Sequence, residues 1–136
     1  MSESGADVGG LTLPESLLHA IDGGRWKPPG DVQLLREVFA DEPDWPQFYD
    51  VATMVRQNQK FQKKSASELE DQVPGSSLGL GIEPGLAVLI GSLGADMPIA
   101  LDYRSERENP RVIYLAEDGW HEVAPTFEEL GRRLSL

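Results

Sequence analysis

The stretch LAVLIGSLGADMPIALDYR, residues 86–104, decides the fold. Its first part, LAVLIGSL, is a continuous apolar run that ends before Gly94, which is typical of a strand buried on both faces. The second part, PIALDYR (98–104), begins with a proline, and a strand tolerates proline at its first position. In an extended chain Asp102 and Arg104 share one face, so a charged pair lies next to the predicted core. Three roles are open for this pair: it takes part in catalysis, it stabilises the strands, or it belongs to a surface that binds a partner.

Two further strands and a helix are predicted after this stretch. The segment RVIYLAEDGWHEVA (111–124) has Asp118-Gly119 between two alternating runs, which is the strongest hairpin signal in the chain. Thr126 and Glu129 then form a capping box, which predicts a C-terminal helix. Acidic residues in its first turn and basic residues in its last turn favour the same helix through its dipole.

Helical patterns precede the strands. LPESLLHAIDGG (13–24) predicts a short helix that the glycine pair ends. Asp31 is a plausible N-cap for a second helix, VQLLREVFA. The proline-punctuated segment DEPDWPQFYD (41–50) cannot form one long helix, and its last residue, Asp50, is a candidate cap for a third.

The third predicted helix, VATMVRQNQKFQKK (51–64), has an apolar and a basic face. The apolar face is expected to meet the core through Val51, Met54, Val55 and Phe61. The basic face is expected to carry Arg56, Lys60, Lys63 and Lys64. Residues 65–85, which alternate acidic with Gly-, Pro- and Ser-rich pieces, are expected to form mainly a loop excursion.

This order of elements predicts an α+β domain. We expect N-terminal helices, then a mainly antiparallel four- or five-stranded sheet, and a C-terminal helix packed on it. The 136 residues fit a single domain. Residues 1–12, which are rich in Gly, Ser and Asp, are expected to form a flexible N-terminal lead-in.

Composition narrows the functional classes. The chain has no cysteine, which excludes disulfides and thiolate chemistry and fits a reducing cytoplasm. No secretory signal and no apolar run long enough for a membrane span is visible, so we expect a cytoplasmic protein without a membrane partner. The net charge of −11 argues against nucleic acid as a ligand and favours a basic partner, although such a charge also serves solubility alone.

Catalytic and metal-binding patterns are not found in the sequence. The only histidines, His19 and His121, lie in different predicted elements without metal-ligand spacing. There is no nucleophile elbow, and the glycines of GLGIEPG (79–85) match neither phosphate-binding pattern. We therefore predict a protein that is not an enzyme, with no catalytic residues, no metal and no cofactor. A hydrolase that uses His121 and Asp102 is a remote alternative.

The ordered combination of motifs resembles a known superfamily. The segments VLIGSLGADMPIALDYR and PRVIYLAEDGWHEVAPTFEELGRRL, together with LPESLLHAIDGG, are similar to the SUKH superfamily. This superfamily contains the yeast Smi/Knr-type regulator of cell-wall synthesis and many bacterial immunity proteins. The resemblance covers roughly residues 11–24 and 86–136. It implies one SUKH-like domain over residues 1–136 that works by binding protein, with a basic, often nuclease-type toxin domain as the expected partner. A regulatory scaffold of a housekeeping or cell-wall pathway is the alternative.

Two sets of contact residues are predicted. The first is an acidic and aromatic segment, because Trp and Tyr are typical interface anchors; it comprises Asp41, Glu42, Asp44, Trp45, Phe48 and Tyr49. The second follows from the family resemblance and comprises Asp102, Tyr103, Arg104 and Trp120. Core packing is the competing interpretation for Trp45, Tyr103 and Trp120, and an ion pair that fixes the strands is the competing interpretation for Asp102 with Arg104. The sequence leaves the oligomeric state open, and a homodimer joined through a sheet edge is one of the alternatives.

Overall fold

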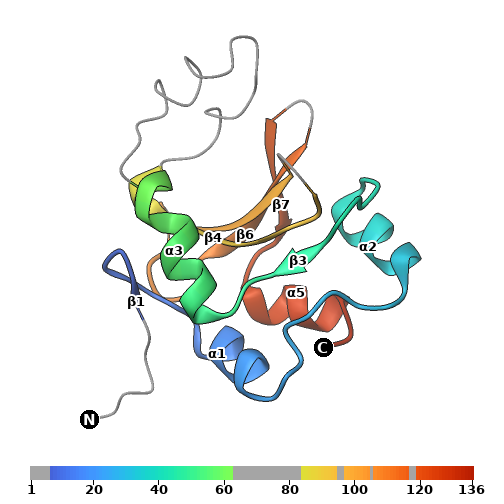
Figure 1. Ribbon diagram of the computed structural model, residues 1–136, viewed down its shortest axis with the longest axis horizontal. Helices are drawn as coiled ribbons and strands as arrows, with labels where there is room; N and C mark the ends of the chain where they lie inside the picture. Colours follow the sequence, from blue (N-terminus) through green and yellow to red (C-terminus); the bar gives the residue numbers. More distant parts are fainter. Residues whose placement is uncertain (1–6, 63–83, 95–96, 105, 117–118) are drawn as a thin grey trace.

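The computed structural model describes residues 7–62, 84–94, 97–104, 106–116 and 119–136 (Figure 1). The predicted α+β class is confirmed. The elements in chain order are β1 (Asp7–Val8), β2 (Leu11–Thr12), α1 (Glu15–Asp22), α2 (Val32–Phe39), β3 (Gln47–Phe48), α3 (Val51–Phe61), the short 3₁₀ helix η1 (Pro84–Leu86), β4 (Ala87–Ser92), β5 (Pro98–Asp102), β6 (Arg111–Ala116), β7 (Gly119–Ala124) and α5 (Phe127–Arg133).

The main sheet has five strands in the order β3-β4-β5-β6-β7, and all neighbours are antiparallel. The last four strands form the predicted meander. Ala116 pairs with Gly119, so β6 and β7 form the predicted hairpin, whose Asp118 lies outside the described residues. β3 adds an edge strand of two residues, which the sequence did not indicate.

Alternation along the strands divides the buried side chains between the two faces of the sheet. The larger core cluster includes Val88, Leu101 and Tyr114 from one face, together with residues from β1, β2, α1, α2, α3 and α5. α1 and α5 lie side by side on this side of the molecule (Figure 1). On the other face Ala87, Ala100 and Ile113 form a smaller cluster. Ala87 and Val88 are neighbours on opposite faces and both are inaccessible, so β4 is buried on both faces as predicted.

The predicted caps hold the helix starts. Asp31 Oδ1 accepts hydrogen bonds from the backbone N–H groups of Gln33 and Leu34 at 3.0 and 3.4 Å. Asp50 Oδ1 accepts from the N–H of Thr53 at 2.8 Å, and Thr126 Oγ1 accepts from the N–H of Glu129 at 3.1 Å. These bonds satisfy N–H groups that have no partner inside the helix.

Two expectations for the N-terminal half are wrong. Residues 7–12 are not a flexible lead-in, because β1 pairs with β2 and the hairpin buries Val8 and Leu11; residues 1–6 lie outside the described part. Val55 does not face the core but is exposed. The sequence predicted Met54 as a core residue, and it is fully buried, with Asn58 one turn later buried beside it. Of the predicted basic face, Arg56 is exposed; the side chains of Lys60, Lys63 and Lys64 lie outside the described part, as do residues 65–83.

α3 completes the edge of β4 where β3 has ended. The side-chain amide of Asn58 donates to the carbonyl of Leu89 at 3.0 Å and accepts from the N–H of Leu89 at 2.8 Å. One turn further along, Gln62 Nε2 donates to the carbonyls of Ala87 at 2.9 Å and Val8 at 3.2 Å. Two amide side chains thus take the place of a strand, which leaves this part of the sheet edge covered. No helix among the described residues is long and apolar enough to cross a membrane.

Candidate partner-binding surface

Asp102 is the centre of a buried ion-pair network at the end of β5. Its side chain is 2% exposed. Arg104 donates to it through Nε at 2.9 Å and Nη2 at 2.9 Å, and Arg111 donates through Nε at 2.8 Å. Arg111 lies opposite Asp102 in the β5–β6 register and also contacts Glu122 on β7 at 3.5 Å. The network therefore links three successive strands of the sheet.

This network explains why a strand carries a charged pair near its core. Burial alone raises the pKa of the Asp102 carboxyl, but hydrogen bonds from Arg104 and Arg111 outweigh it, so the pKa lies below its ordinary value. The carboxylate is ionised at neutral pH, and its acceptor positions are occupied by two guanidinium groups. The geometry supports the architectural interpretation of Asp102.

Tyr103 and Trp120 lie in different surroundings. Tyr103 is fully buried, and its hydroxyl donates to the carbonyl of Thr12 at 2.7 Å, which ties the sheet to the β1–β2 hairpin. Burial raises the pKa of its phenol. Trp120 is half-buried and packs on the small cluster around Ala100 and Ile113. Tyr103 is therefore a core residue that a partner cannot reach without unfolding this part of the sheet.

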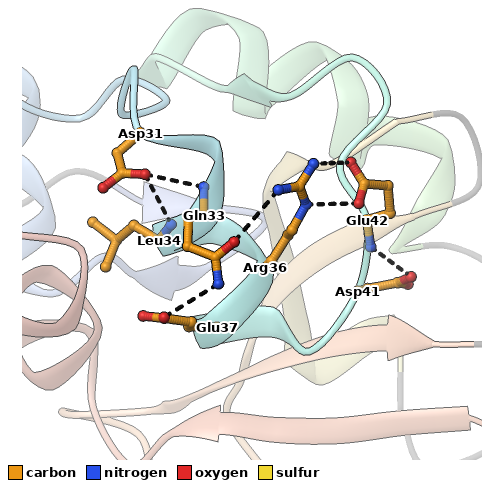
Figure 2. A network of polar contacts seen from close by, with 7 residues as sticks. All are labelled: Asp31, Gln33, Leu34, Arg36, Glu37, Asp41 and Glu42. Carbon is orange, nitrogen blue, oxygen red and sulfur yellow. Dashed lines mark hydrogen bonds and ion pairs between the residues drawn. The ribbon is translucent and has the colours of Figure 1, made fainter.

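The acidic and aromatic segment 41–49 is fastened to α2 (Figure 2). Arg36 holds Glu42 with two charge-assisted bonds, Nε to Oε1 at 2.7 Å and Nη2 to Oε2 at 3.0 Å. The hydrogen bond from Arg36 holds the pKa of the Glu42 carboxyl below its usual range. Asp41 Oδ1 accepts from the N–H of Glu42 at 2.8 Å, while its Oδ2 accepts from the hydroxyl of Tyr114 at 2.6 Å.

The same segment is fixed to the edge of β4 by its backbone. The N–H groups of Asp44 and Trp45 donate to the carbonyl of Leu93 at 2.8 and 3.0 Å. β3 then pairs with β4, and the approach is so close that a Cβ atom on Gly91 would lie 2.7 Å from the carbonyl oxygen of Gln47. Glycine is required at this position because any side chain would push β3 away.

Side chains of the segment alternate between anchoring and exposure. Phe48 is half-buried and stacks on Trp26, with ring centroids 4.1 Å apart. Tyr49 is also half-buried and packs against the core. Trp45 is 73% exposed although its backbone is held on both sides. The core-packing interpretation of Trp45 therefore does not fit the structure, since a core tryptophan buries its ring.

The ten predicted contact residues do not form one surface. The 41–49 segment runs from α2 to β3, where Gln47 pairs with Ser92 at the end of β4. Asp102 pairs with Ala87 at the other end of β4, roughly 17 Å away for five residues at about 3.4 Å each. Sequence reasoning passed over Trp26. The available signal was an aromatic residue between a glycine pair and a proline pair.

The structure does not assemble the alternative catalytic pair. His121 lies opposite Tyr114, whose side chain belongs to the large-core face of the sheet, whereas Asp102 shares the other face with Ala100. Side chains on opposite faces cannot share a proton. Among the described residues there is also no group of three His, Asp or Glu side chains that could hold a metal ion.

Fold and surface define an α+β domain whose distinctive feature, within the described residues, is an exposed aromatic side chain on a firmly held acidic edge. The chain belongs to the SMI1 / KNR4 family (SUKH-1), whose model matches residues 8–132. The predicted resemblance is confirmed, and membership supports a binding module of the immunity or regulatory type. No curated protein and no solved structure matches the chain.

Proposed function

We propose that this protein is an immunity protein that acts in the cytoplasm and neutralises a basic toxin domain by binding it directly. The contact surface is the segment 41–49, with Trp45 as its central anchor. The observation that carries the proposal is the 73% exposure of Trp45 on a backbone fixed by Leu93 and by the β3–β4 pairing. A rigid anchor loses little conformational entropy when it binds, so more of its contact energy appears as affinity.

The charge of the segment supports a basic partner. Within residues 36–45 the acids Glu37, Asp41, Glu42 and Asp44 face a single base, Arg36. Complementary charge accelerates the encounter of two proteins and suppresses wrong partners. A toxin that acts on nucleic acid carries a cationic active site, and an acidic edge with a protruding indole is suited to cover it.

A regulatory scaffold is the second candidate, because the family contains both types of protein. A scaffold would use the same edge with weaker contacts to several partners. The two functions differ in stoichiometry and in salt dependence, since contacts made mainly by exposed charges weaken as salt rises.

The test is capture of partners by the tagged protein from its own cell lysate at low and high salt, with Trp45→Ala and Val55→Ala in parallel. Val55 is a matched control, because it is an exposed apolar residue on a different element, α3. We expect one stoichiometric basic protein that stays bound to the wild type and to Val55→Ala at high salt and is lost with Trp45→Ala. Several partners that dissociate as salt rises would favour the scaffold. Equal capture by all three proteins would contradict the role of Trp45.

A further inference from the structure

A groove of about 600 Å³ continues from the proposed contact segment. One wall comes from Trp26 and Pro28 in the connection after α1, and the other from α3. Thr53, Arg56 and Gln57 line the α3 wall, because they follow each other at helical spacing on one face. The whole of β3 lies along the groove, as do Tyr49 and Asp50.

Among the described residues, β3 has a neighbouring strand on one side only. In an antiparallel ladder hydrogen-bonded and non-hydrogen-bonded residue pairs alternate. Tyr49 donates its N–H to the carbonyl of Ile90 at 2.9 Å, so the preceding pair, Phe48 with Gly91, is of the non-hydrogen-bonded kind. The N–H and C=O of Phe48 therefore point away from β4, and β3 is the last strand of the sheet on this side.

The groove also carries a buried donor without an acceptor. Trp26 is 6% exposed, and its indole N–H has no hydrogen-bond partner among the described residues. A buried unsatisfied donor costs roughly 1–3 kcal/mol.

The charges of the lining select the occupant. Asp50 is engaged by the N–H of Thr53, and that bond lowers the pKa of its carboxyl. Among the described residues that line the groove, Arg56 is the one cation, and it is exposed, with a hydrogen bond from Nη2 to Thr53 Oγ1 at 3.2 Å. An acidic side chain on the occupant would complement it.

We propose that this groove binds an extended segment of the partner protein, which pairs with β3 as an added strand and places an acidic side chain against Arg56. The inference rests on the proposed function and adds the direction of docking. Basic groups of the partner meet Glu42 and Asp44, while its acidic strand residue meets Arg56. A partner with acidic groups at Glu42 and Asp44 and a basic strand residue at Arg56 is rejected, because like charges would then meet at both places.

The experiment uses random linear peptides displayed on phage and selected on the purified full chain. We expect enriched peptides that carry an acidic residue near apolar ones. Their affinity should fall about tenfold or more with Arg56→Glu and with the groove-narrowing Gln57→Trp. It should stay unchanged with Val55→Ala, because Val55 is exposed on the same helix but does not line the groove. Arg56 and Gln57 are both exposed, so the two variants are expected to fold, which thermal melting checks.

Two results would contradict the proposal that the groove binds a segment of the partner. One is a selection that enriches no linear peptide; the other is enriched peptides that bind Arg56→Glu and Gln57→Trp as well as the wild type. Neither result touches the role of Trp45, because that role is tested with the captured partner and the Trp45→Ala variant. The experiments therefore distinguish a wrong groove proposal from a wrong proposed function.

Discussion

Replacement of Asn58 by alanine tests how α3 is joined to the sheet. The substitution removes both hydrogen bonds between the side-chain amide and the backbone of Leu89, at 2.8 and 3.0 Å, and a third to the carbonyl of Met54 at 2.7 Å. The N–H and C=O of Leu89 lose their partners. Each orphaned group costs roughly 1–3 kcal/mol when buried. Because Leu89 is half-buried, we take the lower part of that range and expect a loss of about 2–4 kcal/mol in the free energy of unfolding.

The assay is equilibrium urea denaturation together with amide hydrogen exchange. A loss of this size lowers the melting temperature by roughly 8–16 °C, at about 4 °C per kcal/mol for a chain of this length. The Leu89 amide should exchange faster in the variant, because its acceptor is gone. Gln59→Ala is the matched control, since Gln59 is an exposed amide on the same helix, and it should stay within about 0.5 kcal/mol of the wild type. If Asn58→Ala were as stable as Gln59→Ala and kept the Leu89 amide protected, α3 would not be held in this way.

Three further predictions concern the ion-pair network, the close approach of β3 and the exposed anchor. Because the pKa of Asp102 is lowered in the folded protein, its contribution to stability is present above its ordinary pKa of about 3.9 and is lost as pH falls through the lower folded value. Asp102→Asn should therefore make the free energy of unfolding depend less on pH in the acidic range. An unchanged pH dependence would contradict the network. Gly91→Ala should cost about 1–3 kcal/mol, because its Cβ would lie 2.7 Å from the carbonyl oxygen of Gln47; a wild-type denaturation midpoint would show that β3 can move aside freely. Trp45→Ala should leave the free energy of unfolding within about 0.5 kcal/mol of the wild type, since the ring is exposed; a large loss in denaturation would assign Trp45 to the core.

Features with a local signal could be predicted from the sequence. Each cap needs a side chain within three residues of the N–H that it accepts from, as with Asp31 and Thr126. The β6–β7 hairpin likewise follows from two alternating runs separated by a turn signal. In such cases the physical cause lies within a few residues of the chain, so the pattern contains it.

Features that depend on distant partners could not be predicted. Helical spacing made Val55 as good a core candidate as Met54. In the structure Val55 is exposed, and Asn58 is buried because its side chain bonds to Leu89 on β4. The burial of Asp102 depends on the register that places Arg111 opposite it. Trp26 was overlooked because its stacking partner, Phe48, lies on a strand of two residues that carries no pattern of its own.

For the candidate surface, the segment 41–49 remains a prediction, and the structure shows how its side chains are held. The acidic and aromatic composition of residues 41–49 was visible in the sequence. Which aromatic side chain is exposed depends on the hydrogen bonds to Leu93 and on the stacking of Phe48, and neither can be read from composition.

The most direct test of the account is the affinity of the purified basic partner for the wild type, Trp45→Ala and Val55→Ala, measured by calorimetry beside their melting temperatures. We predict that Trp45→Ala weakens binding by at least about thirtyfold, the loss of roughly 2 kcal/mol typical of a central anchor, while its melting temperature stays at that of the wild type. Val55→Ala should bind like the wild type. Unchanged affinity of Trp45→Ala would contradict the central claim that the edge at residues 41–49 is the binding surface.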